Sequence, residues 1–311
     1  MKLGYACINM TLSDAPKSRR VTTNRTMIKR TFKEKGVKYA SELALANVSD
    51  LGRILKWNED NGIKFFRMSS DFFPWASEYD LWRLPDYNHI KYLLHVAGDF
   101  ARVNDHRLTF HPGPFNVLGS PNGKVVENTI KELNHHSRVF DMMGYKEATH
   151  YNKINIHVGG TYGGDFSGTA QRWCEGFERL DENCKKRITL ENDDKASMWS
   201  VKHLYEHIHS KVGVPIVFDY HHHRFNDGGL SEEEALKLAV STWPPGIKPV
   251  VHLSESRAEE QKNRKIRPQA HSDYIYNPVD SHGQDFDMML ECKSKELALL
   301  KYRKILGAMA A

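Results

Sequence analysis

The chain has 311 residues, of which 40% are hydrophobic and 27% charged, a composition typical of globular proteins. It contains no run of 18 or more apolar residues, so we expect no membrane-spanning helix and no membrane partner. The formal net charge of +5 is compatible with a polyanionic partner without requiring one, and the unusual count is that of the histidines, of which there are 17.

Eight short segments have the apolar, β-branched and aromatic composition of buried strands, and each is followed by a helical pattern or a loop. The predicted strands are 2–7, 63–70, 107–113, 153–160, 187–193, 216–220, 248–254 and 286–293. The predicted helices are 41–61, 87–104, 123–143, 168–184, 197–212, 231–242 and 294–305. Alternating strands and helices predict a parallel sheet, and eight such units predict an α/β fold, a (β/α)₈ TIM barrel in which residues 1–311 form a single domain.

The N-terminal residues and the cysteines indicate the cellular compartment. The first residues, Met1–Tyr5, are typical of a strand and not of a signal peptide. The four cysteines form no Cys-x-x-Cys pattern, which speaks against a disulfide framework or a thiolate zinc site and favours a reducing compartment. We therefore expect an intracellular protein, cytoplasmic in a prokaryote and nuclear or mitochondrial in a eukaryote. A monomer is the expected oligomeric state.

Residue types that bind metals recur late in six of the eight predicted strands. A barrel brings the carboxyl ends of its strands to one face, where the active sites of this fold lie. Two further histidines follow in adjacent loops. The eight candidates are His111, His157, Glu191, Asp219, His252, Glu291, His222 and His271.

This set of side chains indicates a divalent-metal site. Imidazole and carboxylate ligands without thiolates suit Mn, Fe, Zn or Ni. A carboxylate that bridges two cations holds them about 3.5–4 Å apart, which allows both the attacking and the leaving oxygen of a phosphoryl displacement to be stabilised. A single histidine at a strand end is more often a hydrogen-bonded core residue than a metal ligand. Six ionisable groups without partners, however, would each cost several kcal/mol to bury, which favours metal binding by the group. Five other histidines lie on helical patterns and are expected at the surface: His135, His136, His203, His207 and His209.

Two other features have a structural and a functional interpretation. Residues 13–36 are basic and rich in threonine, and they are predicted to form a long loop with some helix that is either solvated or in contact with phosphates. Phe72, Phe73, Trp75 and Phe115 follow predicted strand ends. They either anchor loops by packing, or stack on and wedge between nucleobases.

Ten short motifs, taken in order from near residue 2 to near residue 300, resemble those of the UV damage endonuclease family. They are Leu3–Asn9, Thr23–Thr26, Phe66–Ser77, Leu108–Gly113, Gly119–Pro121, His157–Gly160, Leu190–Asp193, Asp219–His222, Ala270–Tyr274 and Glu291–Lys293. The resemblance implies a TIM barrel similar to the endonuclease IV-type AP endonucleases. It also implies a hydrolase that nicks duplex DNA immediately 5′ to cyclobutane pyrimidine dimers and 6-4 photoproducts, initiating alternative excision repair, with up to three divalent metal ions, expected to be Mn²⁺.

The resemblance also implies roles for individual residues. One metal would be held by His111, His157 and a bridging Glu191, a second by Glu191, Asp219, His252 and Glu291, and a third by His222 and His271. Glu191, Asp219, His252 and Glu291 would be the catalytic residues. The residues expected to contact DNA or the lesion are Tyr5, Asn9, Pro114, Phe115 and, in the basic segment, Arg25.

The sequence departs from the family pattern at three places. Glu78 stands where some members have a histidine, which leaves a ninth ligand open. Val250 stands where some members have a lysine that can be carboxylated. After His111–Gly113 the family often has glutamine and an aromatic residue, whereas this chain has Pro114 and Phe115, so the preferred lesion is open.

Three alternative functions are compatible with these patterns. An AP endonuclease of the endonuclease IV type would use the same barrel and the same metal chemistry. A metal-dependent sugar isomerase would need neither the basic segment nor an aromatic residue such as Phe115. A DNA-binding protein without catalysis would not need the intact carboxylates Glu191, Asp219 and Glu291.

Overall fold

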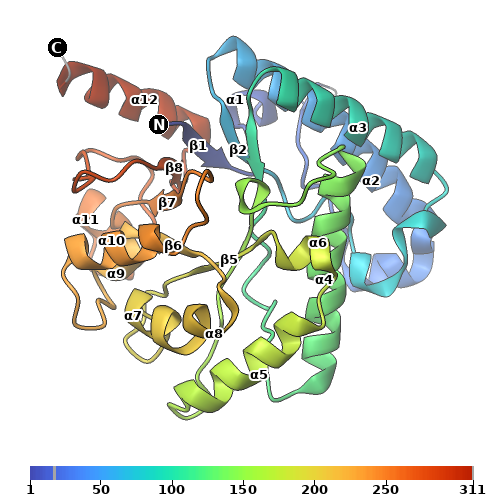
Figure 1. Ribbon diagram of the computed structural model, residues 1–311. Coiled ribbons are helices and arrows are strands. Elements are labelled where there is room, and N and C mark those ends of the chain that lie inside the picture. The colour runs from blue at the N-terminus through green and yellow to red at the C-terminus, as the bar shows by residue number, and fades with distance from the viewer. Residues whose placement is uncertain (17–18, 310–311) are drawn as a thin grey trace.

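The computed structural model, which describes residues 1–16 and 19–309, consists of eight parallel strands enclosed by helices (Figure 1). The strands are β1 Leu3–Ala6, β2 Phe65–Arg67, β3 Arg107–Thr109, β4 Ile154–Ile156, β5 Ile188–Glu191, β6 Ile216–Asp219, β7 Val250–Leu253 and β8 Asp287–Leu290. They pair in the order β3-β2-β1-β8-β7-β6-β5-β4. The two ends of this order are joined because the Phe110 amide donates to Lys153 O and the Asn155 amide to Phe110 O, each over 2.9 Å. The predicted (β/α)₈ barrel is thus confirmed.

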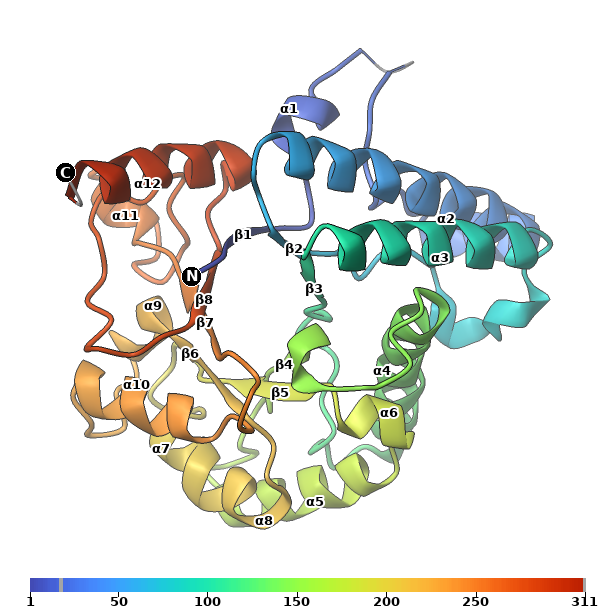
Figure 2. The same ribbon diagram turned by 45° about the horizontal axis from the view of Figure 1, so that its top comes forward.

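The helices lie outside the ring of strands (Figure 2). The longer helices are α2 Lys29–Asp60, α3 Tyr87–Val103, α4 Gly123–Met142, α5 Phe166–Glu178, α10 Glu232–Ser241 and α12 Lys295–Met309. The short helices are α1 Met10–Ser13, α6 Glu182–Lys185, α7 Val201–Leu204, α8 Ser210–Val212, α9 Tyr220–His223 and α11 Arg257–Glu260. Three 3₁₀ turns, η1 Ala76–Glu78, η2 Leu81–Arg83 and η3 His150–Asn152, and one π-helical turn, η4 Tyr205–His209, complete the chain. Among the described residues, no helix combines the length and the apolar character needed to cross a lipid bilayer.

Three predicted helices differ from those observed. Helix α2 begins at Lys29 and not at 41, because Gly36 adopts a positive φ of 63° and joins two helical stretches across a kink. The helix predicted over 168–184 is divided into α5 and α6. The helix predicted over 197–212 begins at Val201 and contains the π turn.

The amino-terminal end of the barrel is filled by a buried cation. The side chain of Arg107 is fully buried, and its Nη1 donates to the carbonyl of Lys248 over 2.8 Å and to Asp287 over 3.0 Å. The guanidinium also lies 4.7 Å from the centre of the Tyr151 ring. The ion pair with Asp287 offsets part of the cost of burying the guanidinium. The opposite, carboxyl end of the barrel is left for the functional residues.

The predicted surface position of two histidines is wrong. His135 and His136 on α4 are each only 5% exposed, because η1 packs against this face of the helix. His136 Nδ1 lies 2.8 Å from the carbonyl of Glu132, and its ring meets Phe110 edge-on at 4.7 Å. Histidine has an apolar ring edge, so a helical pattern alone does not distinguish a covered from an exposed position. The other three, His203, His207 and His209, are half-buried.

The contact of α3 with the end of α4 depends on a glycine. A Cβ at Gly98 would lie 1.9 Å from the carbonyl oxygen of Met143, whereas a Cβ at Gly52 on α2 would meet nothing within 4 Å. We expect Gly98→Ala to destabilise the protein by about 1–3 kcal/mol because the helices must separate. Gly52→Ala should stabilise it by about 0.5–1 kcal/mol through helix propensity. Urea unfolding of both variants measures the difference, and an unchanged or higher stability of Gly98→Ala would contradict this packing.

Candidate metal centre

The carboxyl ends of strands β3 to β8 carry the six predicted strand-end ligands. Glu191 and Asp219 are the last residues of β5 and β6, and His252 lies within β7. The remaining three follow their strands by one or two residues: His111 after β3, His157 after β4 and Glu291 after β8. Since all strands are parallel, these side chains meet at one end of the barrel.

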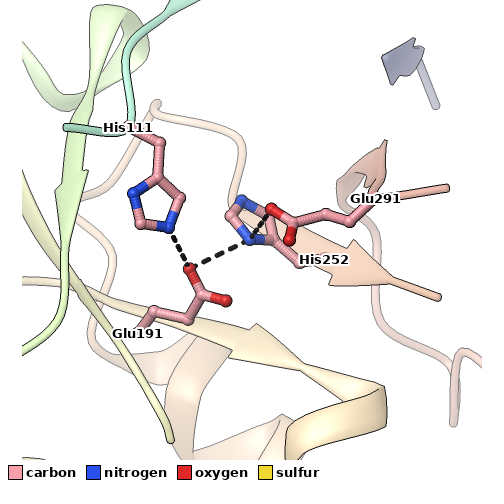
Figure 3. A group of neighbouring side chains, drawn as sticks. All are labelled: His111, Glu191, His252 and Glu291. Carbon is pink, nitrogen blue, oxygen red and sulfur yellow. Dashed lines mark hydrogen bonds and ion pairs between the residues drawn. The ribbon is translucent and has the colours of Figure 1, made fainter. Parts of the chain in front are cut away.

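Four of them form a first group of ligand atoms. His111, Glu191, His252 and Glu291 point toward one another (Figure 3), and their ligand atoms all lie within 4.8 Å of each other. Glu191 Oε2 lies 3.0 Å from His111 Nε2 and 3.1 Å from His252 Nδ1. The same His252 nitrogen lies 3.1 Å from Glu291 Oε1. Two imidazoles and two carboxylates around one space form a ligand set for a divalent cation.

The second group uses the other oxygen of the same glutamate. Glu191, Asp219 and His222 also have ligand atoms within 4.8 Å of one another, and His222 Nδ1 lies 3.4 Å from Glu191 Oε1 and 3.9 Å from Asp219 Oδ2. Asp219 caps helix α9 by accepting from the amide of His222 over 2.8 Å. This cap turns the chain directly after β6 and places the His222 ring beside Glu191.

The last two predicted ligands lie at the margin of these groups. His157 Nε2 is 3.9 Å from Glu191 Oε2, while its Nδ1 faces Asp193 Oδ1 at 3.0 Å. His271 Nδ1 lies 3.7 Å from Glu291 Oε2, and the His271 ring is 5.8 Å from that of His222. The structure therefore brings all eight predicted residues to one end of the barrel and groups six of them.

Four residues at the site were not predicted from the sequence. Arg67 forms an ion pair with Glu291, Asn155 donates a hydrogen bond to Glu191, and Lys153 Nζ lies 3.3 Å from His252 Nε2. The fourth is Asp193, which orients His157. The sequence pattern could have indicated Lys153 and Asn155. Positions 153, 155 and 157 alternate along the strand predicted over 153–160, so these two side chains are expected on the same side as His157.

Burial and neighbouring charges shift the ionisation of the cluster. Burial opposes protonation of His157, but the carboxylates of Asp193 and Glu191 outweigh it and raise its pKa to about 10. In His222, burial is likewise outweighed, by Asp219 and Glu191, and the pKa rises to about 9. Burial would raise the pKa of Glu191, yet the histidines around it hold that pKa well below its usual value. The carboxylates of the site thus favour positive charge beside them, carried either by protonated histidines or by a bound cation.

Buried polar atoms that form no hydrogen bond also support cation binding at this site. Glu191 Oε1 and Asp219 Oδ2 are buried and accept no hydrogen bond within residues 1–16 and 19–309. Buried polar atoms normally have a partner, and carboxylate oxygens such as these two bind metals. The residues present therefore fit one or more divalent cations with Glu191 shared between them.

The residues expected to contact the lesion are found in contrasting surroundings. Tyr5 and Asn9 are buried and bound to one another, since Asn9 Nδ2 donates to the Tyr5 hydroxyl over 2.9 Å and that hydroxyl donates to Asn58 over 2.7 Å. Neither side chain is presented to solvent. Phe115, in contrast, is 87% exposed.

Two further residues singled out in the sequence lie apart from both ligand groups. Arg25 is paired with Asp50 over 2.6 Å, which ties the basic segment to α2. Glu78, on η1, is exposed and belongs to neither group of ligand atoms.

The fold and the site define a (β/α)₈ barrel with a histidine–carboxylate centre at the carboxyl ends of its strands, and comparison with known proteins identifies the family. The family model described as UV-endonuclease UvdE matches residues 1–310. The chain belongs to the UV-endonuclease UvdE family and is a DNA-cleaving hydrolase.

Individual relatives agree with this assignment. The UV-damage endonuclease of Schizosaccharomyces pombe is 33% identical over 96% of this chain and 50% of its own length, so this chain spans about half of that protein. The UV DNA damage endonuclease of Bacillus cereus (strain G9842) is 30% identical over 99% of this chain and 95% of its own length. The crystal structure of SacUVDE has a TM-score of 0.82 at 32% identity and covers 100% of this chain and 99% of that one. D-Psicose 3-epimerase from Clostridium cellulolyticum H10, with a TM-score of 0.53 and 12% identity, shares the fold alone.

A metal-content measurement tests the shared role of Glu191. We expect protein incubated with Mn²⁺ and then desalted to retain the metal, and Glu191→Gln to lose most of it, because an amide offers only one good ligand oxygen and no charge. Mn²⁺ at about 100 times its Kd should also stabilise the wild type by about 2.7 kcal/mol, and the variant much less. Glu78→Gln, which alters an exposed carboxylate outside both groups, serves as the control. Equal metal content in Glu191→Gln and wild type would contradict the site.

Proposed function

We propose that this protein nicks duplex DNA immediately 5′ to UV photoproducts, both cyclobutane pyrimidine dimers and 6-4 photoproducts, in a reaction that depends on divalent metal ions, with Mn²⁺ as the principal ion. The observation that carries the proposal is the position of Glu191, whose two oxygens face two groups of ligand residues in a chain of the UV-endonuclease family. His157 would join His111 and Glu191 around one of these ions. His271, whose ring lies 5.8 Å from that of His222, would hold a third ion together with His222.

The protein residues prepare the site for phosphodiester hydrolysis. Bound divalent cations would supply Lewis acidity toward the phosphate oxygens and lower the pKa of an attacking water. Asn155 and Arg67 hold the carboxylates of Glu191 and Glu291 in place, so that little rearrangement is needed when substrate binds.

Damage would be recognised on the loop between β3 and α4. Phe115 is 87% exposed, so an apolar ring is presented to solvent four residues along the chain from His111 of the metal centre. A dimer has lost part of its stacking, which makes its displacement from the duplex less costly than that of normal bases. Pro114 precedes the ring and fixes its own φ, so it restricts the angle at which Phe115 enters the duplex. This geometry supports recognition by deformability, with lesions beyond pyrimidine dimers among the substrates.

The basic segment would contact phosphates of the duplex. Arg19 and Arg20 are exposed on it. Arg25 would act mainly as its anchor, since its guanidinium is paired with Asp50. Tyr5 and Asn9 would contribute by supporting the turn from β1 into α1, where Asn9 also caps the helix by accepting from the amide of Leu12 over 2.9 Å.

A mapped nicking assay tests the proposed function. Purified protein with Mn²⁺ is incubated with end-labelled duplexes that carry one pyrimidine dimer, one abasic site or no lesion. We expect a single cut immediately 5′ to the dimer and no cut in the intact duplex. Cleavage of the abasic duplex alone would identify an AP endonuclease instead. Glu191→Gln and Asp219→Asn should abolish the cut with unchanged circular dichroism, and wild-type turnover in either variant would refute the assigned catalytic roles.

Phe115→Ala tests the wedge. Loss of base–aromatic stacking should lower the ratio of affinities for damaged and undamaged duplex by roughly 10- to 100-fold, because a stacked base contributes about 1–3 kcal/mol. Tyr92→Ala removes a 63% exposed ring from the outer helix α3 and should leave the ratio unchanged. Binding constants for both duplexes give the result, and a wild-type ratio in Phe115→Ala would show that this ring does not read damage.

Replacing Arg19 and Arg20 together by glutamine tests the basic segment. Phosphate contacts carry no lesion information, so affinity should fall about equally for damaged and undamaged duplex. The slope of log affinity against log salt should become shallower by about 0.9 for each phosphate that the variant no longer neutralises. Arg25 is left unchanged in this variant because its ion pair with Asp50 belongs to the fold. An unaltered slope would place this segment away from DNA.

A further inference from the structure

The loop that follows β4 presents a second exposed aromatic ring at the same end of the barrel. Tyr162 lies five residues after His157 and is 45% exposed, just as Phe115 lies four residues after His111. Strands β3 and β4 are neighbours in the closed barrel, and the rings of His111 and His157 are 5.3 Å apart. Two adjacent strands therefore each end in a histidine of the metal centre and continue into a loop that carries an aromatic ring.

The base of the Tyr162 loop is firmly held. Trp199 Nε1 donates to the carbonyl of Gly159 over 2.9 Å, and the hydroxyl of Thr161 donates to the carbonyl of Ser197 over 3.0 Å. A Cβ at Gly159 would lie 2.5 Å from Val117 Cγ1, so this loop also lies directly against the loop of Phe115. The base of the loop is therefore fixed by contacts on both sides.

The tip of the loop has an unusual backbone. Tyr162 has a φ of 48°, in the left-handed region, and Gly163 and Gly164 follow with φ values of 91° and 86°. A bulky residue rarely adopts this conformation, and such strain concentrates at functional sites. Added Cβ atoms at both glycines would meet nothing within 4 Å, so packing does not explain why this tip projects.

An arginine supports the ring from the protein side. The guanidinium carbon of Arg172 lies 5.6 Å from the centre of the Tyr162 ring. Arg172 Nε donates to the carbonyl of Gly119 over 3.1 Å and Nη2 to the hydroxyl of Thr169 over 3.0 Å, which fixes the guanidinium between the two loops. The charge supports the ring and is itself attractive to a nearby phosphate.

We propose that Tyr162, supported by Arg172, is a second stacking residue that holds one unstacked base of the duplex opened at Phe115. The inference rests on the proposed function and names a further residue for its substrate recognition. Stacking requires only a π face, so Tyr162 contributes affinity with little dependence on base identity. Two rings on adjacent loops would keep the strands apart while the scissile phosphate lies between them at the metal centre.

Two substitutions separate the ring from the backbone. Tyr162→Asn removes the ring but keeps a residue that tolerates positive φ, whereas Tyr162→Phe keeps the ring and removes only the hydroxyl. We expect Tyr162→Asn to bind the dimer-containing duplex about 5- to 150-fold more weakly than wild type and Tyr162→Phe to bind like wild type. Both variants should keep the wild-type metal content.

Fluorescence identifies the base concerned. The adenine analogue 2-aminopurine is placed at successive positions around the dimer in both strands. At one position its fluorescence should be quenched on binding by wild type and Tyr162→Phe, and remain unquenched with Tyr162→Asn.

The results of these measurements distinguish the stacking role of Tyr162 from the proposed function. Wild-type affinity and quenching in Tyr162→Asn would overturn the stacking role, as would an equal loss in Tyr162→Phe, which would assign the effect to the hydroxyl. A wild-type protein that does not distinguish damaged from undamaged duplex would instead overturn the proposed function itself.

Discussion

A single buried carboxylate organises the functional end of this barrel. Glu191 has no exposed surface, and its two oxygens face different groups of histidines and carboxylates. Burying so much like charge is unfavourable unless it is balanced, and within the chain it is balanced by Arg67 and by the high pKa values of His157 and His222. A buried cluster of charged side chains contributes unfavourably to the stability of the fold, but it is well suited to bind cations.

The barrel makes this concentration of charge possible. Six of the eight candidate ligands are placed by six different strand ends, so no flexible loop has to bring the two carboxylates Glu191 and Asp219 together. At the opposite end, the buried Arg107 forms an ion pair with Asp287 inside the barrel. The buried ion pair thus lies at the amino-terminal end of the barrel, and the candidate metal ligands lie at its carboxyl end. The exposed aromatic rings lie on loops at this carboxyl end.

Much of this could be predicted from the sequence, because periodicity and position along a strand determine where a side chain points. The alternation of strands and helices predicted the barrel, and the late position of residues such as His252 in their strands placed them at one end. Contacts between side chains from distant segments could not be predicted in this way. The pairing of Arg67 with Glu291 depends on the distance between the ends of β2 and β8, which no local pattern encodes.

The resemblance places Tyr5 and Asn9 at a lesion pocket, and the structure shows that both side chains are buried and hydrogen-bonded to each other, so their role at the lesion stays a prediction. Two local predictions were wrong. The burial of His135 depends on η1 from another part of the chain, and the early start of α2 depends on one glycine with a positive φ. In each case a tertiary contact or a single backbone dihedral overrides the local pattern.

Anomalous diffraction from crystals soaked in MnCl₂ tests the central claim most directly. If Glu191 is shared between two cations, the anomalous difference map will show two peaks, one beside Oε1 and one beside Oε2 of Glu191, separated by about 3.5–4 Å. Absence of any peak within bonding distance of Glu191, with manganese bound elsewhere on the protein, would contradict it.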